Sequence, residues 1–334
     1  MSRPEDHARE TLAALNISVD QLVRFVRPLD ADETLLLSGS IANGLGNPLS
    51  DVDLVLLGRS SPDDAHTPAE AHLQAGPSLL DDREAFALVR PHQDAHRTTS
   101  HHADVTEKAK LLPTDFFYLR QHVVHDQREL LRAGRVHVEC WLPPALDALG
   151  SALSADLAAI AEPTPVAVRS PLSKQQLCVL DRIRSGAVLA NPEAAERWRT
   201  RLGLDRLVDY LTWYWLDEFF GLRAKMRGAA ADDNPVAAQW LLRLTFSALA
   251  GALLASVGET NTYPKWRTRL LARHRAAIGD ARCARLLSYM FADAISDSGT
   301  IEAAADWGGA VAGEIQSSRP AASVSARHGV KVYC

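Results

Sequence analysis

Two short polar clusters, separated by a ten-residue spacer, carry residue types that could do chemistry. Gly39 and Ser40 follow one apolar run, and Asp51 and Asp53 stand at the start of a second. Glycine in a tight turn lets an anion approach backbone amides, and a serine hydroxyl can donate to a phosphate oxygen. Paired carboxylates are hard oxygen ligands of the kind that Mg²⁺ prefers. The stretch therefore offers a phosphate-binding turn beside a divalent-cation site.

The apolar runs at 35–37 and 54–57 must position these clusters. Both are short and bounded by Gly, Asn and Pro, a pattern that predicts buried strands. Residues i and i+2 of a strand point to the same face, so Asp51 and Asp53 are expected to project together. Two close carboxylates repel each other, and solvent or a cation must offset that repulsion. Two solvated acids at a strand end are the simpler alternative.

Gly39-Ser40, the ten-residue spacer and Asp51-Val52-Asp53 within apolar flanks resemble the signature of the polymerase-beta-like nucleotidyltransferase superfamily. The resemblance implies an N-terminal α+β domain with a mixed sheet and helices. It also implies a nucleoside triphosphate substrate, ATP by default, and a third carboxylate on a later strand. An Asp-x-Asp pair alone would be a weak signal, but here position, spacing and hydrophobic context agree.

Glu139 is our candidate for the third carboxylate. In RVHVECW, Val136 and Val138 alternate with His137 and Glu139, which predicts a strand with Glu139 opposite the valines. The alternatives are an edge-strand acid facing water, or Asp104 as the third carboxylate. The histidine-rich stretch around residue 104 is interpreted as an exposed loop rather than a metal site.

The implied site then has the following assignments. Two Mg²⁺ ions are held by Asp51, Asp53 and Glu139, and the triphosphate is bound by Gly39 and Ser40.

Lys265 is a further candidate for binding phosphate. Pro264 predicts the start of a helix, so that Lys265 is displayed in its first turn, where a cation is slightly disfavoured by the helix dipole. A lysine placed before Trp266 resembles a feature of small-molecule nucleotidyltransferases, in which a basic residue of the helical domain reaches the triphosphate. The alternative is a surface lysine beside a tryptophan that anchors the helix.

The rest of the chain predicts a division into an α+β domain and an all-helical domain. We expect a nucleotidyltransferase domain over residues 1–150, a helical substrate domain over 151–316 and a flexible tail over 317–334. Helices are predicted at 79–90 and 113–133, and helix follows helix from residue 173 to 296 without a strand. The aromatic residues between 205 and 226 are expected to be core residues rather than a stacking surface.

Composition narrows the class of protein. A formal net charge of −5 argues against a nucleic-acid binder, which would usually be basic. Four scattered cysteines suggest neither a zinc site nor a disulfide framework. No signal peptide and no membrane span are expected, and the predicted location is the cytoplasm. The sequence does not indicate an oligomeric state.

The functional expectation is therefore transfer of a nucleoside monophosphate to a hydroxyl of a small-molecule acceptor. The domain order is similar to that of aminoglycoside and lincosamide nucleotidyltransferases. Two alternatives stay open: a protein-modifying nucleotidyltransferase of the toxin–antitoxin type, and a non-catalytic nucleotide-binding relative.

Overall fold

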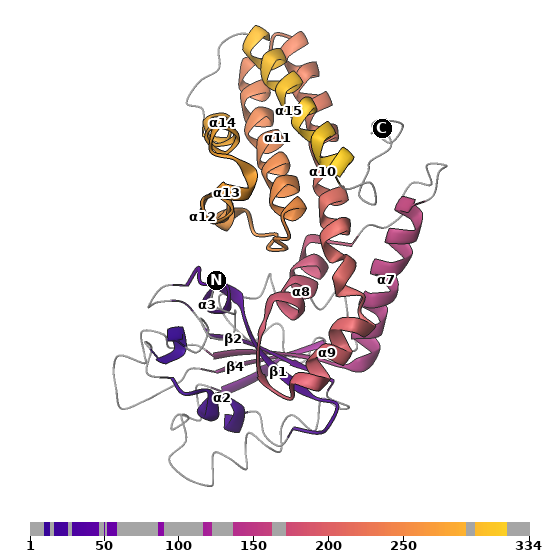
Figure 1. The fold of residues 1–334 in the computed structure, drawn as a ribbon, viewed down its shortest axis with the longest axis vertical. Helices are drawn as coiled ribbons and strands as arrows, with labels where there is room; N and C mark the ends of the chain where they lie inside the picture. The colour runs from indigo at the N-terminus through magenta and orange to yellow at the C-terminus, as the bar shows by residue number, and fades with distance from the viewer. Residues whose placement is uncertain are drawn as a thin grey trace. The chain divides into compact units, whose positions relative to one another are not determined.

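The chain falls into two units, each with its own internal packing (Figure 1). The structure, a computed structural model, describes residues 10–13, 17–25, 29–46, 50, 52–58, 86–89, 116–121, 136–161, 172–291 and 298–318. The first unit comprises Met1–Ala152 and Ser173–Leu204. The second comprises Leu153–Leu172 and Asp205–Cys334.

A six-stranded mixed sheet organises the first unit, in the order β3-β4-β5-β2-β1-β6. β2 and β5 run parallel, and the other neighbouring pairs are antiparallel. This arrangement confirms the predicted fold class, a mixed α+β region followed by a largely helical part. The strands are β1 (Thr34–Ser38), β2 (Val52–Leu57), β3 (Phe86–Val89), β4 (Phe116–Gln121), β5 (Val136–Trp141) and β6 (Ala187–Ala190).

β1 and β2 lie in the interior of the sheet, as their apolar sequences predict. Leu35–Leu37 and Leu54–Leu57 are all buried. A strand that is covered on both faces reads as a continuous apolar run rather than an alternating one. The two strands pair antiparallel, with Thr34 opposite Leu57 at one end and Ser38 opposite Asp53 at the other. The Gly39-Ser40 cluster and Asp53 therefore belong to the same end of this strand pair.

Three local predictions were wrong. Residues 116–121 form strand β4 where a helix was predicted over 113–133, and residues 86–89 form strand β3 within the helix predicted at 79–90. β6 interrupts the region predicted to contain only helices. At β3 and β4, pairing with a neighbouring strand decides the conformation and overrides local propensity.

Besides a helical stretch at residues 10–13, five helices accompany the sheet in the described part of the first unit. The side chain of Ser173 accepts a hydrogen bond from the Gln176 backbone amide, and the Gln176 side chain accepts one from the Ser173 amide. This capping box confirms the predicted cap at Ser173. The helices are α2 (Val19–Phe25), α3 (Gly39–Ala42), the first half of α7 (Pro143–Ala161), α8 (Lys174–Ser185) and α9 (Pro192–Arg201).

The observed units differ from the predicted division at residue 150. Ser173–Leu204 belongs to the first unit, because β6 pairs with β1 and brings α8 and α9 against the sheet. The second half of α7 belongs to the second unit, where Tyr210 donates to Asp156 at 2.8 Å. Burial raises the pKa of both side chains. At Asp156 the hydrogen bond from Tyr210 offsets part of that rise.

The described residues of the second unit form helices joined by short loops, without a strand. Close contacts join its long helices: a Cβ atom at Gly251 would lie 2.7 Å from the Trp215 ring, and one at Gly308 would lie 3.0 Å from the Phe219 ring. Burial of Trp213, Trp215 and Phe219 confirms that the aromatic segment is core. The helices are α10 (Leu207–Ala231), α11 (Pro235–Ser256), α12 (Arg267–Arg273), α13 (Arg275–Ile278), α14 (Asp280–Met290) and α15 (Ser298–Ser318), with 3₁₀ turns at η3 (Leu204–Arg206) and η4 (Pro264–Trp266).

α15 was not predicted, and it continues to Ser318, so two residues of the predicted tail are helical. Residues 319–334 of that tail lie outside the described residues.

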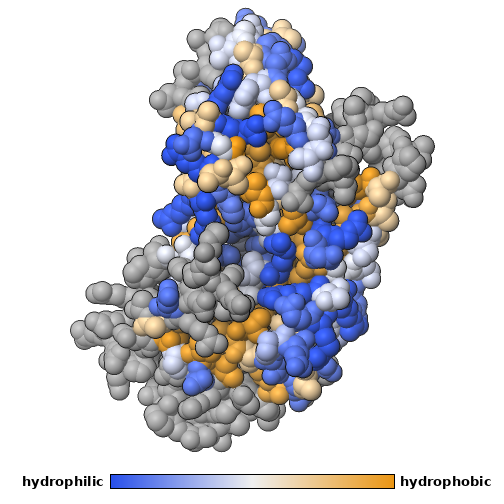
Figure 2. All heavy atoms as spheres, viewed as in Figure 1, coloured by the Kyte–Doolittle hydropathy of each residue, from blue (hydrophilic) through white to orange (hydrophobic). Residues whose placement is uncertain are grey.

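Two described helices, α7 and α11, are long and apolar enough to cross a membrane by length and composition alone. This is weak evidence, because the core helix of a soluble protein passes the same test, and 56% of the relevant α11 window is buried inside the protein. On the visible face of the second unit, Figure 2 shows hydrophilic residues interspersed with apolar ones.

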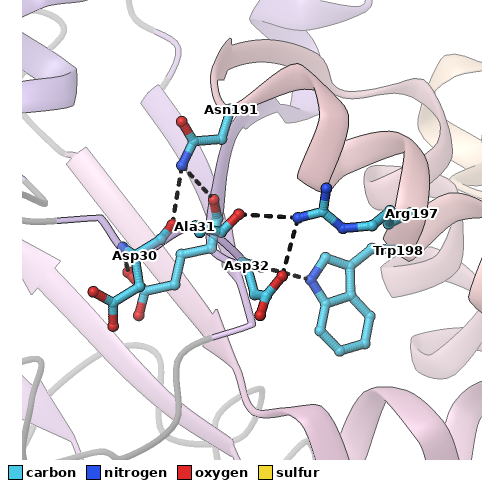
Figure 3. Close-up of polar contacts among 7 residues, drawn as sticks. Asp30, Ala31, Asp32, Asn191, Arg197 and Trp198 are labelled. Atoms are coloured by element: carbon cyan, nitrogen blue, oxygen red, sulfur yellow. Dashed lines mark hydrogen bonds and ion pairs between the residues drawn. The ribbon is translucent and has the colours of Figure 1, made fainter.

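The turn that leads into β1 is held by residues around α9 (Figure 3). The Asn191 side chain donates to the carbonyl oxygens of Asp30, at 3.1 Å, and Glu33, at 2.8 Å. Trp198 Nε1 donates to the carbonyl oxygen of Asp32 at 3.0 Å, and Arg197 pairs with the Asp32 carboxylate. These contacts fix the end of β1 opposite to the Ser38–Asp53 pair.

Gly58 is expected to be essential for this packing. Its φ is +89°, and a Cβ atom would lie 2.9 Å from Trp198 Nε1 and closer still to the carbonyl oxygen of Asp32. Gly58→Ala should lower the free energy of unfolding by more than about 2 kcal/mol, because left-handed strain of roughly 1–2 kcal/mol adds to a backbone clash. Urea unfolding followed by tryptophan fluorescence measures the change.

Gly203→Ala is the matched control. Gly203 also has a positive φ, +67°, but its surroundings leave room for a methyl group. Its variant should show the strain alone, about 1 kcal/mol. Equal losses in the two variants would contradict the proposed clash at Gly58.

Candidate active site

The turn after β1 has the conformation that the sequence predicted. Gly39 has a φ of +71°, in the left-handed region that favours glycine. The carbonyl oxygen of Ser40 accepts from the amides of Leu45, at 2.8 Å, and Gly46, at 2.9 Å, and this closes the loop. Gly39 and Ser40 remain partly exposed to solvent. The backbone and the Ser40 hydroxyl are therefore within reach of a ligand.

The Asp53 carboxylate lies directly against this turn. Asp53 pairs with Ser38 across the two strands, and Ser38 Oγ donates to the Asp53 carbonyl oxygen at 3.4 Å. A Cβ atom at Gly39 would lie 2.9 Å from Cγ of Asp53 and closer still to Oδ2. Glycine is thus needed at residue 39 for two reasons, the positive φ and the adjacent carboxylate. Asp53 is itself partly exposed, so a cation in solution can reach it.

Two other predicted acids lie outside the described residues. These are Asp51, the first carboxylate of the motif, and Asp104, the alternative third carboxylate. The assignment of Asp51 to the site stays a prediction from the alternation of side chains along a strand.

Glu139 lies on the same face of the sheet as Asp53. In the parallel pairing of β2 with β5, His137 is opposite Asp53 and Glu139 is opposite Val55. Glu139 is therefore one same-face step further along the strands than Asp53. It is 3% exposed and lies on an interior strand, so the alternative of an edge-strand acid facing water was wrong. The Cα atoms of Asp53 and Glu139 are expected to be roughly 8 Å apart from standard strand geometry.

Glu139 also has a partner that was not predicted. Arg182, near the end of α8, donates through Nη1 to Glu139 Oε1, and in this ion pair the carboxylate is buried and the guanidinium is partly exposed. The structure thus brings the partly exposed Gly39, Ser40 and Asp53 together. Glu139 is buried on the same face of the sheet as Asp53, paired with an arginine.

Comparison with known protein families agrees with this geometry. Residues 19–124 match the nucleotidyltransferase domain family. The match contains Gly39, Ser40, Asp51 and Asp53, and it ends before β5. No curated protein and no solved structure matched the chain.

The nucleotidyltransferase domain offers a partial set of metal ligands within its described residues. Asp53 supplies a partly exposed carboxylate next to the turn, which suits a hard divalent cation. No group of three His, Cys, Asp or Glu side chains able to hold a metal ion occurs among the residues that the structure describes. Asp51, which completes the predicted set with Asp53 and Glu139, lies outside those residues.

Arg182 is the residue that sequence reasoning missed. A signal was present in Gly186-Ala-Val-Leu-Ala-Asn191, an apolar run bounded by turn residues, which is a strand pattern. Since β6 directly follows α8, a strand at 187–190 assigns α8 to the same unit as the sheet.

Lys265 belongs to the second unit, in η4. Its ammonium group lies 5.6 Å from the ring centroid of Tyr263 and 5.0 Å from that of Trp266, within the range of cation–π attraction. Arg267 is buried beside the Trp215 ring, and burial lowers its pKa to about 10. Lys265 is exposed, and its assignment to the triphosphate stays a prediction.

Proposed function

We propose that this protein transfers a nucleoside monophosphate from a nucleoside triphosphate, ATP by default, to a hydroxyl group of a small-molecule acceptor. The observation that carries the proposal is the contact between the Gly39-Ser40 turn and the Asp53 carboxylate inside a nucleotidyltransferase domain. A phosphate bound at the turn would lie next to a cation bound at the carboxylate. Nucleotidyl transfer requires phosphates and a divalent cation in such adjacent positions.

The reaction makes one bond and breaks one. The acceptor oxygen attacks the α-phosphorus, the bond from the α-phosphorus to the bridging oxygen breaks, and pyrophosphate leaves. Bound divalent cations would lower the pKa of the attacking hydroxyl and offset the charge on the leaving pyrophosphate. In our proposal Asp51, Asp53 and Glu139 hold two Mg²⁺ ions.

The other roles belong to the turn. The turn orients the β- and γ-phosphates through the amides of Gly39 and Ser40 and through the Ser40 hydroxyl. A carboxylate of the site, or solvent, takes up the proton of the attacking hydroxyl. Little covalent chemistry is asked of the protein, because positioning and electrostatic stabilisation supply most of the rate.

We infer a small acceptor of the aminoglycoside or lincosamide kind from the domain order and the acidic net charge of −5. A cytoplasmic location belongs to the same proposal. Pyrophosphate release should be measured with Mg²⁺ and each nucleoside triphosphate, against a panel of hydroxylated small molecules and candidate proteins. We expect release with one small-molecule class, together with a mass increase of one nucleoside monophosphate residue on the acceptor.

Other outcomes of this experiment would overturn the proposal in different ways. Labelling of a protein alone would favour the protein-modifying alternative. Nucleotide binding without pyrophosphate release for any acceptor would favour a non-catalytic relative.

Lys265→Met tests the proposed contact of the second unit with the triphosphate. We expect the KM for the nucleotide to rise about tenfold, because a lost charge-assisted contact costs about 1.5–3 kcal/mol. Thermal stability should be unchanged, because Lys265 is exposed. Lys225→Met, at another exposed lysine of the second unit, is the control. An unchanged KM in Lys265→Met would contradict a contact with the triphosphate, and Lys265 would then be only a surface residue.

A further inference from the structure

We propose that Arg182 is a positioning residue of the nucleotidyl-transfer site, which directs the Glu139 carboxylate and offsets its charge. The inference rests on the proposed function in one respect, the assignment of Glu139 as third carboxylate. Arg182 lies outside the segment that matches the nucleotidyltransferase domain family.

The position of Glu139 makes a compensating cation necessary. The Glu139 side chain is 4% exposed, and its strand lies between β4 and β2 in the sheet. An ionised carboxylate loses most of its hydration at such a place, and the charge is tolerated only when it is paired and hydrogen-bonded. Arg182 supplies both a fixed positive charge and a hydrogen bond, from Nη1 to Oε1 of Glu139.

Arg182 is itself held in a fixed place, by the connection from α8 to β6. The Gly186 amide donates to the Arg182 carbonyl oxygen at 3.0 Å. A Cβ atom at Gly186 would lie 2.6 Å from that oxygen and 3.1 Å from the carbonyl oxygen of Leu37. The last turn of α8 therefore packs against β1 so closely that only glycine fits. Arg199 adds hydrogen bonds to the carbonyl oxygens of Ile183, at 3.1 Å, and Gly186, at 2.7 Å.

The same connection ties Arg182 to the phosphate-binding turn. Leu37, opposite Ala187 in the β1–β6 pair, is separated from Gly39 only by Ser38. One rigid segment thus sets the positions of the turn, through β1, and of Glu139, through Arg182. Removing a group that hydrogen-bonds to a metal ligand without contacting the metal typically lowers metal affinity or activity by about 10–100-fold.

The experiment measures Mn²⁺ binding by electron paramagnetic resonance and pyrophosphate release on the full-length chain. For Arg182→Met we expect Mn²⁺ affinity to fall at least about tenfold and kcat to fall with it. Arg182→Lys keeps the charge and should recover part of both losses. Arg197→Met, which removes an exposed ion pair with Asp32 in the same unit, should change neither quantity.

A double-mutant comparison tests whether Arg182 acts through Glu139. In a Glu139→Gln background no carboxylate remains to be positioned, so adding Arg182→Met should change Mn²⁺ affinity by less than about twofold. This comparison also keeps the test decisive if Arg182→Met alone fails to fold, since neutralising both members of a buried pair is better tolerated than removing one.

The contrary results are distinct from failure of the proposed function. Wild-type Mn²⁺ affinity in folded Arg182→Met, tighter Mn²⁺ binding in that variant, or a further tenfold loss in the Glu139→Gln background would each overturn the role of Arg182. A wild-type protein that binds Mn²⁺ but releases no pyrophosphate would overturn the proposed function, while the Mn²⁺ measurements would still decide the role of Arg182.

Discussion

Asp53→Asn is expected to lower nucleotidyl transfer at least about a thousandfold, which corresponds to about 4 kcal/mol of activation free energy. Asparagine keeps the shape of the side chain but removes the charge that would hold a divalent cation beside the Gly39-Ser40 turn. Steady-state pyrophosphate release with saturating nucleotide and Mg²⁺ measures the loss. Asp51→Asn should behave in the same way if the first aspartate of the motif shares the site.

Loss of activity counts only if the protein stays folded. Asp53 is partly exposed, so the amide should change the melting temperature little and leave the circular dichroism spectrum unchanged. Asp205→Asn, at an exposed aspartate of η3, controls for loss of one negative charge. Turnover near the wild-type rate in both Asp51→Asn and Asp53→Asn would end the proposed mechanism.

Gly39→Ala is expected to abolish transfer although it alters no group that takes part in chemistry. The added methyl group would occupy the space of the Asp53 carboxylate, since a Cβ atom would lie 2.9 Å from Asp53 Cγ. The positive φ of +71° adds strain of roughly 1–2 kcal/mol. Asp53 must therefore turn away or the loop must move, and either change separates the cation from the phosphates. The activity loss should equal or exceed a hundredfold, which is about 2.7 kcal/mol.

A second measurement separates the two effects of this substitution. Gly203→Ala carries a similar strain without a neighbouring side chain, so it should lower stability slightly and leave the rate unchanged. If Gly39→Ala also weakens Mn²⁺ binding, the displacement of Asp53 is the cause. Full activity in folded Gly39→Ala would show that the turn and the carboxylate do not act together.

The sequence by itself determined the centre of the site. Leu35–Leu37 and Leu54–Leu57 predicted two buried strands, because continuous apolar runs between turn residues have few other stable conformations. The Gly39-Ser40 and Asp51-Val52-Asp53 motif, with its spacing and apolar flanks, predicted a glycine-serine turn beside an aspartate. These features depend on residues that are close together in the chain, so the sequence pattern is sufficient to predict them.

Only the tertiary structure decided what surrounds that centre. Residues 116–121 are a strand because β5 pairs with them, and residues 86–89 are a strand because β4 pairs with them. Glu139 proved to be buried and paired with Arg182, 43 residues further along the chain. The folding of the sheet brings these distant segments together. The sequence around Glu139 does not predict Arg182 as its partner, nor does the sequence around Arg182 predict Glu139. The burial of Glu139, and with it the need for a compensating arginine, therefore follows from the three-dimensional packing alone.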